Sequence, residues 1–338
     1  MNLPQLLKFD YSGFNFEYNN LLPMNYKLTD EDQNNIDYLI NNYGKSNTVI
    51  LYNNQIVYDK LSVFLIQPDY NSNDKLKNFL TKVNSKLCCE LTKDASIIIS
   101  ANKDIYHFSS YIINGINSQL TEQFVMFNNA QVYSYAGLFG TDFKFNTFQN
   151  LTAGNNCFEY SVELCDNANI NLISSNSCNV INSLTVNLKD MYDNCNIKVL
   201  SLAKDKSIQG NLIKINHLNK NTSGEVNCFG VVRENATLQT DCINVIEKGN
   251  SKSAAKQNIK IINLSESAAA SANPQLQINE NDVVASHSAG IGKINENQLY
   301  YMQSRGITRE NATNLIVEGT IKNFLNDVGE EFIYDKFM

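Results

Sequence analysis

The sequence predicts a mainly β chain in which a long coiled stack of short strands is flanked by helical segments at both ends. Three observations support this fold class. Helical periodicity disappears between about residues 93 and 294, where short β-branched and aromatic runs follow one another. A short polar signature recurs between these runs, as in repeat proteins. Amphipathic helical patterns are found only before and after this stretch.

The first part of the chain, residues 1–95, is expected to form a mixed α/β region. A helix is predicted over residues 28–44, because a threonine and three acidic residues begin the segment and a glycine ends it. A second helix is predicted over residues 74–87. Between them, "NTVILYNNQIVYD" predicts a hairpin that turns at Asn53 and Asn54.

Residues 96–294 form the predicted β core. Four strings in it share one pattern, in which two polar residues precede a small residue and, two positions on, an aliphatic one. They are "NNAQV", "DNANI", "DNCNI" and "ENATL", which begin at Asn128, Asp166, Asp193 and Glu234. Their separations lie near multiples of about 13 residues, the length of one strand plus one turn in a coiled β stack. We therefore expect them at solenoid corners; because the spacing varies, a β-sandwich with similar turns is the alternative.

Helical patterns return in residues 295–338. Asn295 can cap a first helix that Gly306 ends, and Thr308 begins a second helix with one apolar stripe. A solenoid leaves unpaired strand edges at both ends, and helices there protect those edges from further pairing. The predicted order along the chain is thus helical, β and helical.

The composition excludes several classes of function. Of the 338 residues 43% are apolar, which is enough for a substantial core, and the formal net charge of −7 comes without a basic run. General nucleic-acid binding is therefore not expected. No run approaches the ~18 apolar residues of a membrane span, and the first residues lack the pattern of a signal peptide. We expect a cytoplasmic protein that binds neither nucleic acid nor membrane.

Common catalytic motifs are also missing. The sequence holds no G-x-x-x-x-G-K-[ST], G-x-S-x-G or H-E-x-x-H pattern. The protein is therefore not expected to be an enzyme, and any ATP hydrolysis must come from a partner. No C-x-x-C pair occurs, so the cysteines are expected to be small apolar core residues. The eight cysteines are Cys88, Cys89, Cys157, Cys165, Cys178, Cys195, Cys228 and Cys242.

Three histidines are the candidate metal ligands. His287 lies among small residues, where another chain or an ion can approach closely. Imidazole binds iron and transfers protons near pH 7, so His287 is the candidate ligand. Ser286 or Ser288 is expected to hold its second ring nitrogen, either directly or through the backbone. The alternative is an interface histidine that makes one hydrogen bond. His217, in an alternating strand, is expected to be structural, and His107 is a weaker candidate still.

Several motifs in the C-terminal part carry a family resemblance. They are "PQLQI", "NDV", "ASHSA" and "YYMQSRGI", which begin at Pro274, Asn281, Ala285 and Tyr300, and an H-x-x-x-x-T segment at His217 and Thr222. They are similar to the P-x-L-x-I, D-D-V, C-S-H-G-A and F-Y-L-x-S-R-G-I blocks of one family. The sequence thus resembles the SufB/SufD family of iron–sulfur cluster assembly scaffolds, in particular its SufD branch.

Departures from the family pattern bear on the site. Ala285 stands where SufD proteins often have a cysteine, and serines flank His287 in place of the acidic neighbours of the SufB-branch E-H-E-A motif. Soft ligands would therefore have to come from a partner chain. The sequence is also short for the family, chiefly at its N-terminal end.

The resemblance implies a right-handed parallel β-helix with helical flanks. It also implies a scaffold subunit that pairs with a SufB-like paralogue and docks a SufC-like ABC ATPase on its C-terminal helical region. No tightly bound cofactor is expected, whereas iron or a nascent iron–sulfur cluster would bind transiently at the subunit interface, near His287. The isolated chain is also a candidate homodimer.

The partner surface is expected on the C-terminal helices, because aromatic and arginine side chains favour interfaces. The alternative is that Tyr300 packs inward and Arg305 pairs with a helix end. The alternative function is that of a β-helix polysaccharide lyase, which needs acids and bases clustered on an exposed sheet face, whereas the acids here are scattered. The candidate partner-binding residues are Tyr300, Tyr301, Arg305, Gly306, Leu315 and Ile316.

Overall fold

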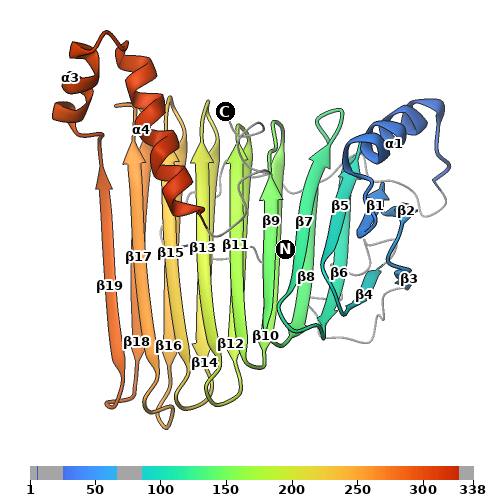
Figure 1. The fold of residues 1–338 in the computed structure, drawn as a ribbon, viewed down its shortest axis with the longest axis horizontal. Helices are drawn as coiled ribbons and strands as arrows, with labels where there is room; N and C mark the ends of the chain where they lie inside the picture. The colour runs from blue at the N-terminus through green and yellow to red at the C-terminus, as the bar shows by residue number, and fades with distance from the viewer. Residues whose placement is uncertain (1–5, 7–25, 67–85, 327–338) are drawn as a thin grey trace.

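Two large sheets form the body of the molecule. The computed structural model describes residues 6, 26–66 and 86–326, and of residues 64–66 and 86 the backbone alone. One sheet has ten strands, in the order β19-β17-β15-β13-β11-β9-β7-β5-β1-β2. The other has nine, in the order β18-β16-β14-β12-β10-β8-β6-β4-β3. From β4 onward successive strands of the chain therefore alternate between the sheets, which is the topology of a β-helix (Figure 1).

The elements have the following bounds. They are α1 (Asp30–Tyr43), β1 (Thr48–Tyr52), β2 (Gln55–Asp59), β3 (Phe64–Ile66), β4 (Lys86–Leu91), β5 (Ala95–Ala101), β6 (Ile105–Ile113), β7 (Ser118–Met126), β8 (Val132–Gly140), β9 (Phe143–Gln149), β10 (Asn155–Leu164), β11 (Asn167–Asn176), β12 (Asn179–Leu188), β13 (Asn194–Ala203), β14 (Ile208–His217), β15 (Ser223–Val232), β16 (Thr237–Ile246), β17 (Ala254–Asn263), β18 (Ala269–Ile278), β19 (Val284–Gly292), α3 (Glu296–Ser304) and α4 (Arg309–Phe324).

The strands of successive coils pair in parallel and in register. From β4 onward every pairing between coils is parallel; β13 and β15, for example, align from Asn194↔Ser223 to Ala203↔Val232. In Figure 1 the odd-numbered strands run upward in the nearer sheet, the even-numbered ones run downward behind them, and the chain advances from right to left, so the coil is right-handed. The predicted parallel β-helix is confirmed, and the alternative β-sandwich is excluded.

The recurring polar signature marks corners, as predicted. Asn128 and Asn129 have φ values of 51° and 58°, Asp166 has 116° and Glu234 has 60°. Asn and Asp enter this left-handed region more readily than other residues with a side chain. The fourth corner is tied by Asp193, whose carboxylate accepts hydrogen bonds from the backbone N–H of Asp166 (2.7 Å) and that of Asp190 (2.8 Å).

The N-terminal predictions are confirmed in part. The first helix is α1, with a capping box at Thr29, and the hairpin is β1–β2, which turns through Asn53 and Asn54 at φ values of 51° and 59°. The predicted second helix is wrong at its end, where residues 86–87 begin strand β4, and residues 74–85 lie outside the described residues. Both sheets begin before residue 96, because β1 pairs in parallel with β5 and β4 with β6.

Inward-facing side chains stack between the two sheets into one long apolar core. A ladder of polar side chains runs within it, from Gln149 to Asn182 (2.8 Å), to Asn211 (3.2 Å) and to Thr240 (3.3 Å). Six of the eight cysteines are buried, as expected of small apolar core residues; Cys88 is half-buried and Cys165 exposed, and all eight are free thiols.

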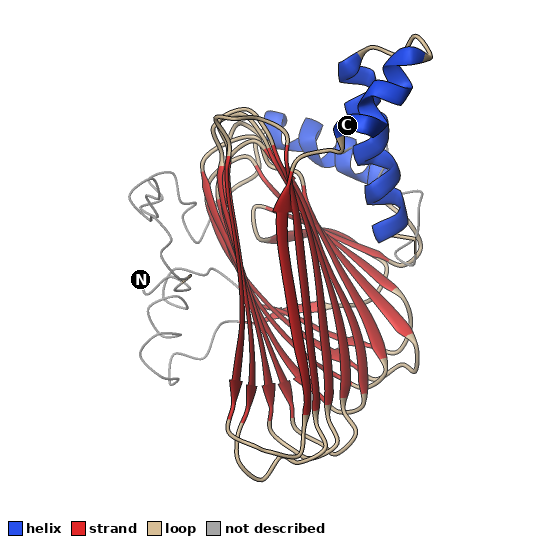
Figure 2. Ribbon diagram, turned by 90° about the vertical axis from the view of Figure 1, so that its left-hand side faces the viewer, coloured by secondary structure: helices blue, strands red, loops and turns tan. Residues whose placement is uncertain are grey.

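Helices cover the outer face of the ten-stranded sheet at both of its ends. Helix α1 packs on β1 and β5 through Ile36, Leu39 and Tyr43. Helix α4 lies across the sheet near β19, where its buried residues contact Leu200, Phe229 and their neighbours (Figure 2). None of the described helices combines the length and the hydrophobicity that a transmembrane segment requires.

A buried carboxyl group lies inside the N-terminal half of the β-helix. Glu122 of β7 is fully buried and accepts hydrogen bonds from the Tyr111 hydroxyl (2.7 Å) and the Tyr160 hydroxyl (3.2 Å). Burial raises the pKa of Glu122 to about 7, and the two hydrogen bonds only partly offset this increase. The carboxyl group is therefore protonated at low pH and costly to ionise above neutrality.

We predict that Glu122→Gln flattens the pH dependence of stability. Because the folded-state pKa is raised above the ordinary value of 4.5, the contribution of Glu122 is fully present below about pH 4.5 and is lost as the pH rises through about 7. That loss amounts to about 3 kcal/mol in the free energy of unfolding. Urea unfolding of both proteins at acidic and mildly alkaline pH measures it.

Glu310→Gln is the matched control, because it makes the same chemical change on the exposed first turn of α4. The free energy of unfolding of this control should depend on pH in the same way as that of the wild type. If the Glu122→Gln profile runs parallel to that of the wild type, the Glu122 carboxyl group does not titrate as described.

Candidate functional site at the open end of the β-helix

The β-helix ends in a coil, made of β18 and β19, that no described residue covers. Every residue of β19 is exposed, and most of β18 is half-exposed. Strand β19 pairs with β17 on one side only and is the leftmost strand of Figure 1. Apolar side chains face solvent there, including Val284 (74% exposed) and Ile291 (47% exposed). The same end of the β-helix thus exposes both an unpaired strand edge and apolar side chains to solvent.

His287 lies on the inner face of this last coil. It is directly opposite Gln257 of β17, whose buried side chain faces the interior. Side chains alternate along a strand, so Ala285, His287, Ala289 and Ile291 share the inward-facing side of β19. The small residues on either side of His287 leave its ring accessible from the open end.

The two flanking serines lie on the other face of β19. The Ser288 hydroxyl donates to Asn258 Oδ1 (2.8 Å) on the outer side of β17, and Ser286 shares that side. The prediction that a serine side chain holds the second ring nitrogen of His287 is therefore wrong, because alternation along the strand points these hydroxyl groups away from the ring.

A polar row lies behind His287 in the interior. Gln257 donates from Nε2 to the carbonyl oxygen of Gln275 (3.0 Å), while its buried Oε1 has no partner among the described residues. Asn244 of β16 is fully buried, and neither of its side-chain polar atoms has a partner in that part of the chain. The sequence analysis missed both residues, although each is a polar residue at an inward position of an alternating strand.

The other two histidines are structural. Nδ1 of His217 lies 2.8 Å from the Thr222 hydroxyl, in the turn that follows its strand, as the sequence analysis expected. Burial lowers the pKa of His217 to about 4 and that of His107, which contacts Asn54, to about 3. Both rings are therefore neutral near pH 7.

No thiol reaches the open end. Cys228 and Cys242 face each other in the sealed interior, with their sulfur atoms 3.6 Å apart. A hydrogen bond with Cys228 and burial raise the pKa of the Cys242 thiol well above its usual range. Among the described residues no group of three or more His, Cys, Asp and Glu side chains could hold a metal ion. Within the described part of the chain, His287 is thus a candidate ligand without two further His, Cys, Asp or Glu side chains beside it.

The C-terminal helices begin where β19 ends, and they expose the predicted partner residues. Tyr300 is 75% exposed and Tyr301 60% exposed, so the alternative that Tyr300 packs inward is wrong. The Arg305 guanidinium lies over the Tyr301 ring, 5.3 Å from its centroid, and does not pair with a helix end through its side chain. Gly306 has a φ of 86° and allows the turn between α3 and α4.

The two helices are held together and against the sheet. Arg309 donates two hydrogen bonds to Glu296 (2.9 and 2.6 Å), and this pair holds the pKa of the Glu296 carboxyl below its usual range. Leu315 is 49% exposed, whereas Ile316 is half-buried. Ile316 lines a groove of about 700 Å³ between α4 and the ends of β17 and β19, which Gly290 and Gln298 also line.

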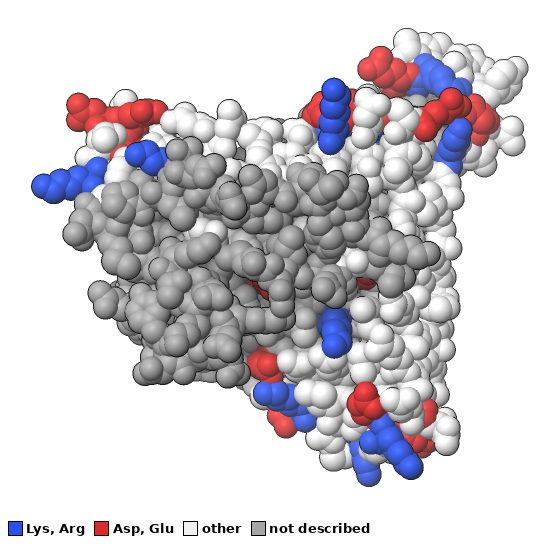
Figure 3. Space-filling view, turned by 180° about the vertical axis from the view of Figure 1, so that it is seen from behind, with Lys and Arg blue, Asp and Glu red and all other residues white. Residues whose placement is uncertain are grey.

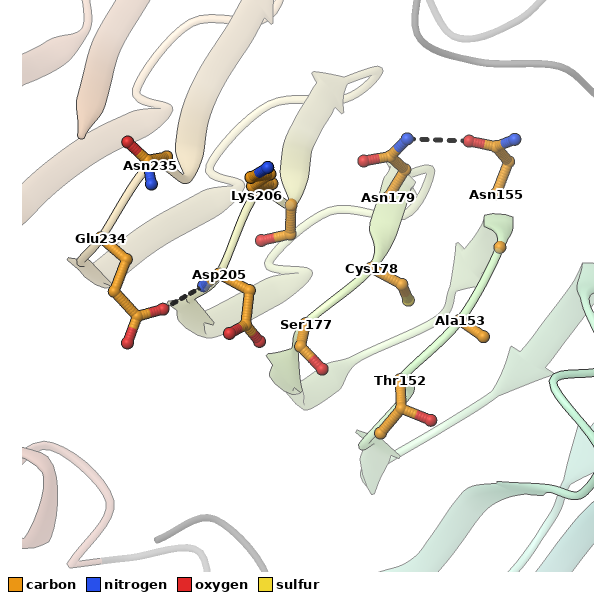
Figure 4. Close-up of a pocket in the computed structure, with 12 residues that line it drawn as sticks. Thr152, Ala153, Asn155, Ser177, Cys178, Asn179, Asp205, Lys206, Glu234 and Asn235 are labelled. Atoms are coloured by element: carbon orange, nitrogen blue, oxygen red, sulfur yellow. Dashed lines mark hydrogen bonds between the residues drawn. The ribbon is translucent and has the colours of Figure 1, made fainter. Parts of the chain in front are cut away.

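A second groove, of about 710 Å³, follows the corners between the two sheets (Figure 4). Its acids support the turns: a Glu234 carboxylate oxygen accepts a hydrogen bond from the Asp205 backbone N–H. Asn179 donates to Asn155 Oδ1 (2.9 Å) in the same way from coil to coil. These groups brace a corner and do not form the acid–base cluster that a lyase needs.

Charge is mixed on the exposed surface. In Figure 3, Lys and Arg side chains stand beside Asp and Glu, and no continuous basic area appears on the part of that face that is not grey. This agrees with the formal net charge of −7.

Comparison with known proteins agrees with this architecture. Residues 102–320 match the family model described as "SUF system FeS cluster assembly, SufBD core domain". The chain is similar to the iron–sulfur cluster assembly protein SufD of Bacillus subtilis (strain 168), with 26% identity over 284 residues. This match covers 84% of the chain but 55% of the relative, so the chain spans about half the length of the curated relative.

The matched region contains the β-helix from β6 to β19, the inward-facing His287, helix α3 and nearly all of α4. It is more than half of the chain, and the relative is a SufD protein. The chain therefore belongs to the SufB/SufD family of SUF-system iron–sulfur cluster assembly proteins, on its SufD branch.

Proposed function

We propose that the protein is a non-catalytic scaffold subunit of a cytoplasmic SUF-type iron–sulfur cluster assembly complex. The observation that carries this proposal is the open last coil, which places His287 on its inner face. A stable solenoid end is normally capped, and this end is left uncovered by the described residues. Family membership supports the same function.

The partner at the open end is a SufB-like paralogue. Strand β19 offers unpaired backbone groups that another chain can extend, and Val284 and Ile291 supply apolar area to bury. A second copy of the chain presents the same surface, so a homodimer forms when the paralogue is absent.

The C-terminal helices dock a SufC-like ABC ATPase. Tyr300, Tyr301 and Arg305 combine exposed aromatic rings with a guanidinium, the side chains that are enriched at protein interfaces. Leu315 extends this surface along α4, and Gly306 sets the angle between the helices. Ile316 contributes to the docking surface as a lining residue of the groove between α4 and the ends of β17 and β19.

Iron, or a nascent cluster, is the cargo of the sealed interface and is not a resident cofactor. The imidazole of His287 suits iron as one nitrogen ligand. Because no thiol of this chain lies on the last coil, the sulfur ligands come from the partner or from the cargo itself. Binding is therefore transient and depends on assembly.

Replacing His287 by alanine should lower the iron and acid-labile sulfide of the purified complex by severalfold. Folding and subunit assembly should be unchanged, because the side chain is exposed and its neighbours are small. The measurement is iron and sulfide per complex, with all partners coexpressed.

Ser286→Ala is the matched control, since it alters the neighbouring residue on the opposite face. Equal iron and sulfide contents in all three proteins, with equal maturation of downstream enzymes, would show that His287 only makes an interface contact.

The double variant Tyr301→Ala, Arg305→Ala should lose the ATPase in copurification and keep the paralogue. These point changes are sharper than deletion of residues 295–338, because α4 covers apolar residues of the sheet such as Phe229. Tyr192→Ala, at a tyrosine that is 68% exposed on a distant turn, is the control. Retention of the ATPase at wild-type stoichiometry would place the docking surface elsewhere.

A further inference from the structure

The residues on the interior side of His287 suggest how its ring is held. Gln257 is the residue directly opposite His287 in the neighbouring strand, and both lie on the inward face. Paired residues of adjacent strands are about 4.8 Å apart, so their side chains are in contact range. The neighbours of both residues on this face are small or aliphatic: Ala255, Ala285 and Ala289 leave room for the ring.

The side-chain amide of Gln257 has a hydrogen-bond partner for its NH2 group but none for its oxygen among the described residues. Its Nε2 is held by the carbonyl oxygen of Gln275 (3.0 Å), which sets the direction of the amide. Its Oε1 is buried and accepts no hydrogen bond from any described residue. A buried carbonyl oxygen without a donor is unfavourable, and the imidazole of His287, at the paired position of β19, can supply a ring N–H.

We propose that Gln257 is a positioning residue for His287: its Oε1 lacks a donor among the described residues, and a turn of the exposed His287 ring lets this oxygen accept the hydrogen bond from one ring N–H, which holds the other ring nitrogen toward the open end. The hydrogen bond fixes both the tautomer and the orientation of the ring. Histidines that bind metal ions commonly have their second nitrogen held in this way by a carbonyl or carboxylate group. The consequence for iron rests on the proposed function, whereas the hydrogen bond itself does not.

Asn244 is the competitor for the Gln257 carbonyl group. The contact between Cys228 and Cys242 aligns the two sheets, and one inward position further along β16 Asn244 faces the same level of the interior as Gln257. Its Nδ2 also has no partner among the described residues. If Asn244 donates to Gln257, the carbonyl group is occupied and His287 has no fixed acceptor.

Nitrogen-15 NMR of the histidine rings separates these two arrangements. The chain has only three histidines, so selective labelling gives three sets of ring signals, and His287→Ala assigns one of them. The spectra are recorded at about pH 8.5, about two units above the ordinary imidazole pKa of about 6.5. The buried rings of His107 and His217 serve as internal references for correct folding.

In the wild type we expect a protected ring N–H proton on His287 and one dominant tautomer. In Gln257→Met, which keeps the length of the side chain but lacks the acceptor, exchange of that proton with water should accelerate about fivefold to tenfold. Asn258→Leu, on the outer face of the same strand, is the matched control and should not change it. Asn244→Leu should also leave the proton protected.

The proposal is overturned if the His287 ring proton of the wild type exchanges at the rate of a solvent-exposed imidazole, or if Gln257→Met leaves it protected. The first result needs no variant, so a variant that fails to fold does not weaken the test. The iron content of the coexpressed complex then separates the two proposals. Iron lost in His287→Ala but kept in Gln257→Met refutes only the positioning role, whereas iron kept in both refutes the metal role of His287.

Discussion

The parallel hydrogen-bond ladder between successive coils is the interaction on which the rest of the structure depends. It aligns inward positions into continuous rows, so that a residue's neighbours inside the core come from the coils before and after it. The Asn182–Asn211–Thr240 part of the polar ladder follows from this alignment, because these three residues occupy paired positions in adjacent strands of one sheet. At β19 the backbone hydrogen-bond ladder has no further strand to pair with among the described residues, and the candidate site lies on this strand.

Much of this fold could be predicted from the sequence because its local signals agree with one another. The corners can be recognised from residue types alone, because only a few residue types enter the left-handed region without strain, as Asn128 and Asp166 do. The caps of α1 and α4 are equally local. The register between coils depends on residues that are about thirty positions apart in the sequence. No pattern in a single sequence predicts which of these residues become neighbours.

The candidate site shows the same limit. His287 could be singled out because it is scarce and lies in a recognisable motif, but its surroundings could not be predicted. Serines adjacent in sequence turned out to face away, whereas Gln257, thirty residues earlier, lies beside it. The exposure of Tyr300 was likewise left open, because an amphipathic stripe does not tell which side of a short helix meets the sheet.

The open coil also determines how the molecule is stabilised. In a stack where each coil contacts only its neighbours, the terminal coil has one neighbour in place of two and is the first to fray. A partner that binds this end therefore acts as a ligand for the folded state of β18 and β19, and its stabilising effect grows with the logarithm of its concentration. The geometry around His287 then depends on how much partner is present. Where the partner is scarce, the open end that carries His287 is the least ordered part of the β-helix.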